Sequence, residues 1–370
     1  SNGEANVHFT VSHDHLGLFK QMVAEKADKY AQRYGIKYNI SFSEQKPSTD
    51  TIAANPDNTP FRNEDGSLLF RPGGHGALIE NLNEIDADVV FIKNIDNVVP
   101  DRLKPETVTW KQVIAGVLVT LQKQAFDYLK VLDSGQYNHE KLEEIIRFVQ
   151  RDLCCRKADI KELEDAELVI YLRKKLNRPM RVCGEHQLEQ IKNGFPFLKL
   201  EGAAAIGKGI MAPTAQEVEN YEKAWNDYKA EGHKIVKFVP ASGAASRMFK
   251  NMFAFLDAPY DVPTTDFEKQ FFENIKKFAF RKALCDKCHV NNEKGIMCLI
   301  KKGDYKAIVA NLLKPEGLNY GQLPKGLLQF HEYEDEVRTP MEEHLVEAAL
   351  YASSNGEANV HFTVSHDHLG

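Results

Sequence analysis

The alternation of apolar and polar residues along the chain predicts five β-strands. The expected strands cover residues 7–12, 38–43, 89–93, 234–239 and 326–331. In the first of them Val7, Phe9 and Val11 alternate with polar residues, which gives a strand with one apolar face. Residues 89–93 and 234–239 are mostly apolar, a pattern typical of strands that are buried on both faces of a parallel sheet.

Segments with helical spacing of their apolar residues separate these strands. The expected helices cover or begin at residues 18–34, 77–82, 215–230, 248–256 and 339–351. Thr339 and Pro340 suit the cap and the first position of the last one. Residues 265–312 predict a mostly helical insertion, and residues 109–177 an almost wholly helical region. Strands that alternate with helices predict an α/β fold with a mostly parallel sheet, whose active sites lie at the carboxyl ends of strands.

Residues 354–370 repeat residues 1–17 without a single change. Because a natural repeat drifts in sequence, we interpret the two copies as a seam. The natural order is then 185–370 followed by 18–184, with 370 − 17 = 353 unique residues. A circular permutation and two fragments in reverse order give the same result, and the sequence does not separate them.

The seam has consequences for the strand that is duplicated. A fold has one place for this strand, so we expect the other copy to be loose. Alternatively, it could pair with a neighbouring molecule in a domain-swapped or fragment-paired dimer. We also expect a chain break or a swap at the joint near residue 184.

Composition excludes several classes of protein. Apolar residues make up 43% of the chain and charged residues 27%, which is enough for a substantial core. The formal charge is −6 and the basic residues are dispersed, so a nucleic-acid partner is not expected. We find no apolar run of membrane-spanning length and no signal-peptide pattern, which favours a cytoplasmic enzyme.

The six cysteines do not form a disulfide framework. Cys154 and Cys155 are adjacent, and a disulfide framework would not pair them. The sequence Cys285-x-x-Cys288-His289, followed by Cys298, could bind zinc. Free thiols on a helix are the simpler interpretation of this single motif.

Two motifs carry groups suited to phosphate. The first lies between a predicted strand and a predicted helix and consists of Ser242, Gly243, Ala244, Ala245, Ser246 and Arg247. Small residues let backbone N–H groups approach a phosphate, and Arg247 adds a full charge. In the second motif, residues 323–326, Lys325 could neutralise a phosphoryl group. A tight turn and a solvated lysine are the structural alternatives.

Three further motifs follow predicted strands or precede a helix. Residues 70–77 form a glycine-rich loop that contains Gly74, His75 and Gly76, and ligand contact is favoured over a simple turn. An apolar strand ends in Asn94-x-Asp96-Asn97, where Asp96 could hold Mg²⁺ or could cap the next turn. Gln45 could read the edge of a base, or could belong to a turn before Pro47.

In the order set by the seam the motifs run SGAASR, LPKG, FSEQKP, RPGGHG and NIDN. This series resembles the UDP-sugar pyrophosphorylase family, which has a GGxGTR-type loop, a PKG or PKS motif, an FxQ segment, a PxG[HN]G loop and a strand ending in DN. The resemblance covers roughly residues 230–370 and 18–105. Within it, the nearest match is an uncharacterised domain-of-unknown-function family of Bacteroides-type bacteria. Ser242 and Ala245 stand where the family has glycine.

The resemblance implies a role for each motif. Residues 242–247 would hold the triphosphate, with Arg247 and Lys325 at the reacting phosphates. Gln45 and the backbone of residues 74–76 would hold the base. Asp96 would bind Mg²⁺, and Asn94 and Asn97 would contact the sugar.

The resemblance also implies a fold, a set of domains and a reaction. The fold is a mixed, mostly parallel sheet of the glycosyltransferase-A-like, Rossmann-related type with helical additions. Residues 231–370, with an insertion at 265–312, form the first half of the nucleotidyltransferase domain, and residues 1–105 form the second. Residues 106–184 and 185–230 are helical. The reaction joins a nucleoside triphosphate, with UTP as the first candidate, to a sugar 1-phosphate and releases pyrophosphate. A glycosyltransferase and a non-catalytic nucleotide-binding protein are the alternatives.

Overall fold

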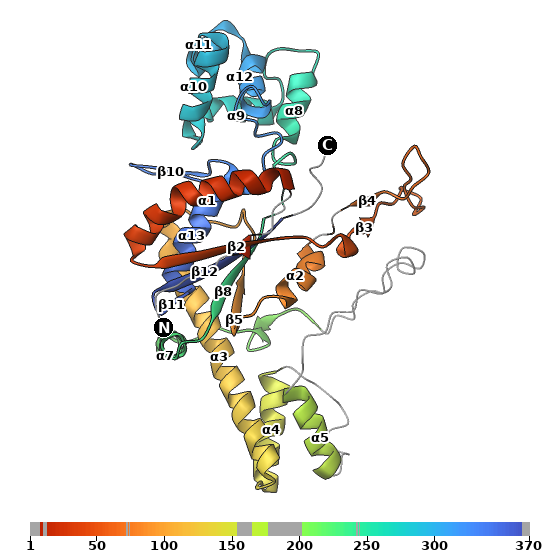
Figure 1. Cartoon of the computed structure of the whole chain (residues 1–370), viewed down its shortest axis with the longest axis vertical. Coiled ribbons are helices and arrows are strands. Elements are labelled where there is room, and N and C mark those ends of the chain that lie inside the picture. The colour runs from red at the N-terminus through yellow and green to blue at the C-terminus, as the bar shows by residue number, and fades with distance from the viewer. Residues whose placement is uncertain are drawn as a thin grey trace. The chain divides into compact units, whose positions relative to one another are not determined.

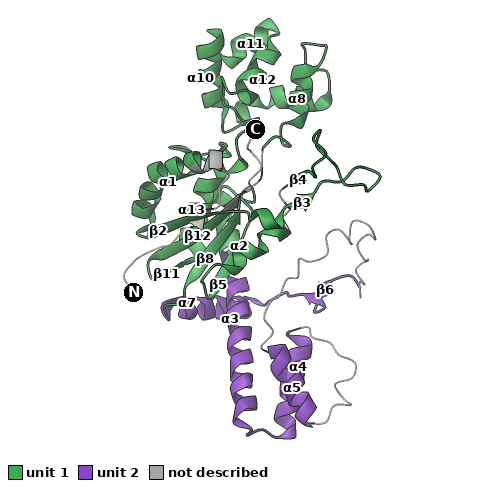
Figure 2. Cartoon of the chain, turned by 45° about the vertical axis from the view of Figure 1, so that its right-hand side comes forward, with its two compact units in different colours: residues 1–108, 232–370 green, residues 109–231 purple. Residues whose placement is uncertain are grey.

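A computed structural model describes residues 8–9, 13–71, 73, 75–153, 165–176, 202–241, 243 and 245–364 (Figure 1). The chain divides into two compact units (Figure 2). Unit 1 consists of residues 1–108 and 232–370, and unit 2 of residues 109–231. The fold is mixed α/β, with a parallel sheet in unit 1 and helices in both units.

The central sheet of unit 1 has the strand order β1-β2-β12-β8-β5, and β11 pairs with β12. These strands are β1 (His8–Phe9), β2 (Lys37–Glu44), β5 (Val89–Ile92), β8 (Ile235–Pro240), β11 (Ser353–Ser354) and β12 (Glu357–Val364). All pairs are parallel except β11 with β12. The carboxyl ends of β2, β12, β8 and β5 therefore lie along one edge of the sheet.

Two long helices cover one face of this sheet. They are α1 (His13–Tyr34) and α13 (Pro340–Tyr351) (Figure 1). Phe19 of α1 and Met341 of α13 pack in one core cluster with Val360 and Phe362 of β12, because alternate residues of a strand point to one face. The helix α2 (Ile79–Asn83) lies on the other face, where Asn81 donates a hydrogen bond to Ser43 Oγ.

The insertion of unit 1 is a group of short helices around an aromatic core. It contains α8 (Lys250–Asp257), α9 (Asp266–Glu273), α10 (Arg281–Asn292), α11 (Ile296–Lys302) and α12 (Tyr305–Leu313). Unit 1 also contains two two-stranded pairs: β3 (Thr51–Ile52) with β4 (Phe70–Arg71), and β9 (His331–Glu332) with β10 (Val337–Arg338). Its 3₁₀ turns are η1 (Pro47–Thr49), η2 (His75–Leu78), η3 (Asp101–Leu103), η5 (Ile275–Lys277) and η6 (Lys325–Leu327).

Unit 2 is mainly helical. It contains α4 (His139–Arg151), α5 (Asp165–Leu176), α7 (Ala215–Ala230), the strand pair β6 (Ala205–Ile206) and β7 (Gly209–Ile210), and most of α3 (Lys104–Ser134). α3, α4 and α5 share a core cluster. The backbones of α3 and α7 come close at Gly116, where a Cβ atom would stand 2.0 Å from the carbonyl oxygen of Tyr221. Among the described residues, no helix is long and apolar enough to cross a bilayer.

The expected strand over residues 326–331 is wrong. Residues 325–327 form the 3₁₀ turn η6, and only His331 and Glu332 enter a strand. The chain turns here because Leu327 N–H donates to Pro324 O. Gly326 is packed against Phe19, and a Cβ atom on it would lie 2.9 Å from the Phe19 ring. The other expected strands are present, although only His8 and Phe9 of residues 7–12 are described as strand.

The two copies of the duplicated segment meet in the same sheet. The second copy forms β12, and the first supplies β1, in which His8 lies opposite His361 and Phe9 opposite Phe362. These are equivalent positions of the repeat. For these two residues the expectation of a loose copy is therefore wrong, since they pair within their own molecule. The joint near residue 184 lies outside the described residues.

Candidate functional site

The loop after β8 and the loop that contains Lys325 are joined by backbone hydrogen bonds. Lys325 N–H donates to Gly243 O at 3.0 Å, and Ala245 N–H donates to Leu323 O at 3.3 Å. A Cβ atom on Gly243 would stand 3.6 Å from Lys325 Cδ, an ordinary contact distance, so the loop lies beside this side chain. Residues 82 and 78 positions apart in the sequence thus form one structural element beyond the carboxyl end of β8.

Asp96 completes this group from the neighbouring strand. The Lys325 ammonium donates to Asp96 Oδ2 at 2.7 Å, across 229 positions of sequence. Both side chains are partly exposed, at 22% for Lys325 and 38% for Asp96. Asp96 follows β5, which pairs directly with β8. The cation and the carboxylate therefore lie together where two adjacent parallel strands end.

The segment that carries Asp96 is fixed to the rest of the fold by His344 of α13. His344 Nε2 lies 3.1 Å from both Asn94 O and Ile95 O. Because carbonyl oxygens only accept, this nitrogen carries the hydrogen and donates. Burial, together with the charge of Lys237, holds the pKa of His344 well below its usual value, so the ring is neutral. Its Nδ1 atom is buried without a partner among the described residues.

A buried ion cluster lies next to His344. Glu347 of α13 accepts from Lys93 at 2.7 Å and from Lys237 at 3.0 Å. Lys237 also donates to His344 O at 3.1 Å. Burial alone would raise the pKa of Glu347, but Lys237 and Lys93 hold it well below its usual range. The cluster ties α13 to β8 and to the end of β5, and so supports the backbone below Asp96.

The remaining described residues of the first motif differ in their exposure to solvent. Arg247 and Ser246 are exposed, and Arg247 makes no hydrogen bond or ion pair with the residues that the structure describes. Ala245 is fully buried in the core cluster of the insertion. Its methyl group therefore points into the core and does not crowd the exposed side of the loop. Ser242 and Ala244 lie outside the described residues.

Gln45 and the glycine-rich loop form a second group at the end of β2. Gln45 is 1% exposed, and its amide nitrogen donates to Thr49 Oγ1 at 3.3 Å while its amide oxygen has no partner among the described residues. A Cβ atom on Gly73 would lie 3.0 Å from Thr49 O, so the loop packs on the same turn. Since β12 separates β2 from β8, this group lies along the same edge of the sheet as Asp96 but apart from it.

The other predicted residues are placed only in part. His75 and Gly76 belong to the 3₁₀ turn η2, and Gly76 is exposed, while Gly74 lies outside the described residues. Asn97 N–H donates to Asn94 O at 3.0 Å, which closes the turn that presents Asp96. Asp96 is exposed at this turn, as is Asn97.

Within the described part of the chain, no cluster of three or more histidine, cysteine or acidic side chains could hold a metal ion. Cys285, Cys288 and Cys298 are free thiols there. Beside Lys325, Asp96 offers one partly exposed carboxylate. One carboxylate suffices for Mg²⁺ when substrate phosphates and water complete the coordination shell, so the residues present fit such an ion.

Sequence reasoning missed His344, Glu347, Lys93 and Lys237 as part of this region. The sequence did contain a signal for buried polar groups here: residues 342–347 include three glutamates and a histidine within a helix that is otherwise mostly apolar. All of residues 340–348 are buried, so these polar groups must be paired within the fold.

Comparison with known proteins identifies a family. A family described as "Domain of unknown function (DUF4301)" matches residues 1–185 and residues 185–370. The chain belongs to this family. The part of the sequence interpretation that pointed to an uncharacterised family is thereby confirmed. The two DUF4301 matches meet at residue 185, beside the expected joint of the seam. No curated protein and no solved structure is similar enough to match.

Proposed function

We propose that this protein is a nucleotidyltransferase that joins a nucleoside triphosphate to a sugar 1-phosphate and releases pyrophosphate. The observation that carries the proposal is the contact of Lys325 with Asp96 at 2.7 Å, beside the Gly243 loop. A cation, a carboxylate and a loop of small residues are groups that phosphoryl chemistry uses. They come from three separate segments of sequence.

The strand order supports a nucleotide-binding fold of the glycosyltransferase-A-like, Rossmann-related kind. If the chain is taken in the order 185–370 and then 18–184, the strands occur as β8, β12, β2 and β5. The sheet order β2-β12-β8-β5 then corresponds to 3-2-1-4. In doubly wound sheets of this order, ligands bind beyond the first and fourth strands, where the order reverses. Asp96 and the Gly243 loop follow those two strands.

The chemistry needs positioning and charge neutralisation. A sugar 1-phosphate is already an oxyanion, so no side-chain nucleophile or general base has to act. Lys325 and Arg247 neutralise the negative charge on the oxygens of the transferred phosphoryl group and on the leaving pyrophosphate. Asp96 would hold Mg²⁺, which supplies further neutralisation of phosphate charge when it is bound. His344 keeps the backbone of residues 94–95 in place.

Two alternative functions would use the same residues. A glycosyltransferase on a similar sheet commonly presents two carboxylates at the strand end, whereas this chain has Asn94 and one carboxylate, Asp96. A non-catalytic nucleotide-binding protein is suggested by Ser242 and Ala245, which stand where the pyrophosphorylase family has glycine. That suggestion is weakened because the Ala245 side chain is buried away from the exposed side of the loop.

The test is a screen for pyrophosphate release. The protein is mixed with Mg²⁺, each nucleoside triphosphate and a panel of sugar 1-phosphates. Release that requires both substrates supports the proposal, and alanine at Lys325 or Arg247 should slow it by about 10²–10³. In a parallel mixture that contains nucleotide sugars and no triphosphate, consumption of a nucleotide sugar without pyrophosphate release would support the glycosyltransferase. Nucleotide binding without turnover on any pair would support the non-catalytic protein.

A further inference from the structure

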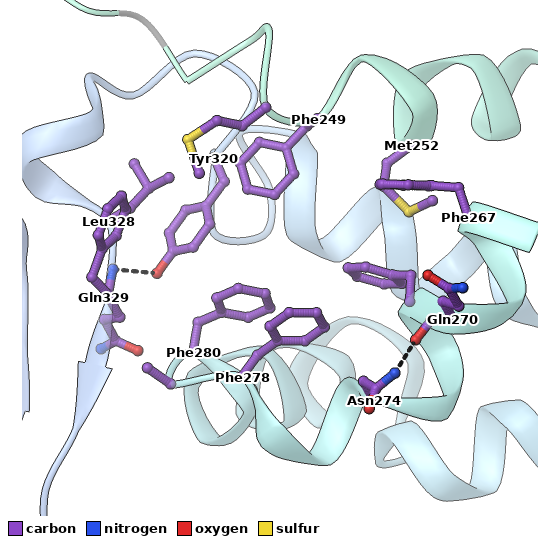
Figure 3. Close-up of a pocket in the computed structure, with 14 residues that line it drawn as sticks. Phe249, Met252, Phe267, Gln270, Asn274, Phe278, Phe280, Tyr320, Leu328 and Gln329 are labelled. Carbon is purple, nitrogen blue, oxygen red and sulfur yellow. Dashed lines mark hydrogen bonds between the residues drawn. The ribbon is translucent and has the colours of Figure 1, made fainter. Parts of the chain in front are cut away.

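An aromatic pocket opens in the helical insertion, next to the loops described above. Its volume is about 560 Å³, within the usual range for small-molecule sites. Figure 3 shows its side chains, with Phe249 and Tyr320 on one side of the space and Phe278 and Phe280 on the other. The rings of Phe278 and Phe280 are stacked, with centroids 5.0 Å apart.

The lining of this pocket restricts the chemistry of its occupant. Its fourteen residues include seven aromatic rings and no charged side chain. A charged group would lose its hydration there without gaining a partner of opposite charge. Tyr320 accepts from Gln329 N–H at 3.2 Å, which leaves its hydroxyl hydrogen for an acceptor on the ligand. Facing ring walls favour a flat guest, because offset and edge-on ring contacts add to the energy of apolar burial.

The pocket and the Lys325 site are built on the same two segments. Arg247 is followed directly by Met248 and Phe249, which line the pocket. Lys325 is followed after two residues by Leu328, another lining residue. Ala245 packs in one core cluster with Phe249, Tyr320 and Leu328. One side of these segments thus faces the pocket core, while their exposed charged residues belong to the proposed phosphate site.

We propose that this pocket binds the flat, uncharged ring of a phosphate ester whose phosphate is held by Lys325 and Arg247. The inference rests on the phosphate site of the proposed function and goes beyond its substrates. Because a sugar ring is neither flat nor apolar, this phosphate ester is a ligand other than the sugar 1-phosphate. A flexible alkyl chain is the competing occupant.

Calorimetric titration with four probes tests this on the full chain. The probes are 1-naphthyl phosphate, 1-naphthol, octyl phosphate and inorganic phosphate. We expect 1-naphthyl phosphate to bind at least about tenfold more tightly than each of the others, since it alone uses both the ring pocket and the cationic site. Lys325→Ala should remove its advantage over 1-naphthol. Ala279→Trp, which fills the pocket, should remove its advantage over inorganic phosphate.

Val290→Trp is the matched control, because Val290 is 78% exposed and does not line the pocket. If Ala279→Trp does not fold, the affinities of the four probes for the unaltered protein still test the inference. The inference is overturned if 1-naphthyl phosphate binds no more tightly than inorganic phosphate. It is also overturned if octyl phosphate binds more tightly than 1-naphthyl phosphate and inorganic phosphate. Neither result affects the proposed function. If inorganic phosphate and pyrophosphate do not bind at all, the proposed function fails first.

Discussion

At the scale of single residues, the candidate site depends on one long-range ion pair and on the groups that hold its backbone. Asp96 is presented by a turn that β8 and α13 fix from two sides, since Ile95 N–H donates to Pro240 O and His344 donates to Ile95 O. A carboxylate on such a fixed turn can be neutralised without moving the backbone. Substitutions at Asp96 and at His344 should therefore have different consequences.

Asp96→Asn should abolish Mg²⁺-dependent pyrophosphate release. The amide keeps the shape of the side chain but removes the charge that pairs with Lys325 and would hold the metal ion. Because Asp96 is partly exposed, the free energy of unfolding should change by no more than about 1–2 kcal/mol. Activity assays and thermal unfolding on the same preparation measure the two effects. Full turnover in this variant would remove Asp96 from the site.

His344→Leu should lower kcat more than it raises KM, because it releases the carbonyl groups of residues 94 and 95 without touching a substrate. His344→Gln is the matched variant, since its amide nitrogen can donate where Nε2 does, and we expect it to recover most of the lost kcat. Steady-state kinetics on both variants provide the comparison. If both lose stability equally and neither alters the ratio of kcat to KM, His344 has only a structural role.

At the scale of elements, α13 is held by charged side chains although it is buried. Its start is fixed by a capping box, in which Thr339 N–H donates to Glu342 at 2.9 Å. Glu343, which is also buried, accepts from Lys104 at 2.5 Å and contacts His331 at 2.8 Å. Such helices need partners for every buried charge, because an unpaired one costs several kcal/mol.

The contact between α1 and Glu336, which lies just before β10, should make the free energy of unfolding depend on pH. Glu336 pairs with Lys29 and Arg33 of α1 and accepts from Arg338 Nε at 2.7 Å. Burial would raise the pKa of Glu336, but Lys29 and Arg338 lower it from 4.5 to about 2. A lowered pKa in the folded state stabilises the fold above the unfolded-state value and loses that effect as the pH falls through 4.5 toward 2.

Glu336→Gln should therefore be less stable than the unaltered protein at pH 7 and should lose less stability between pH 4.5 and pH 2. Denaturant unfolding at a series of pH values gives both quantities. Glu334→Gln, at an exposed position of the same loop, is the control. Parallel pH curves for the Glu336 variant and the unaltered protein would show that this ion cluster does not contribute.

At the scale of the whole molecule, the sheet of unit 1 is assembled from both ends of the chain. Its strands β2 and β5 come from the first 108 residues, and β8 and β12 come from beyond residue 232. The duplicated segment lies at the boundary, where β1 and β12 pair in the register of the repeat. The sheet therefore contains residues from both copies of the repeated segment.

A rearranged chain tests whether the first copy is dispensable. It runs from residue 185 to residue 370, continues directly at residue 18 and ends at residue 184. Because it keeps β12 and links it to α1 through a single copy, we expect the same sheet, with a free energy of unfolding within about 1–2 kcal/mol of the original. Circular dichroism, thermal unfolding and light scattering measure fold, stability and mass. A rearranged chain that does not fold would contradict the interpretation of the seam.

Local sequence determined most of the elements. The helix over residues 215–230 has the predicted limits, and the helix that follows Thr339 begins and ends as predicted, because capping residues and apolar spacing act within a few positions. The strand expected at residues 326–331 failed because its apolar residues serve a buried 3₁₀ turn packed on Phe19. A short apolar run does not reveal what it packs against.

Only the tertiary structure decided which motifs meet. Local sequence marked Lys325 and Asp96 separately, and only the family resemblance assigned them to one site. Their contact depends on β5 pairing with β8, a choice that no local pattern encodes. The same order of strands placed Gln45 apart from them, with β12 in between. The roles of His344 and Glu347 also follow from packing, since a polar residue in a helix shows its purpose only when its buried partners are known.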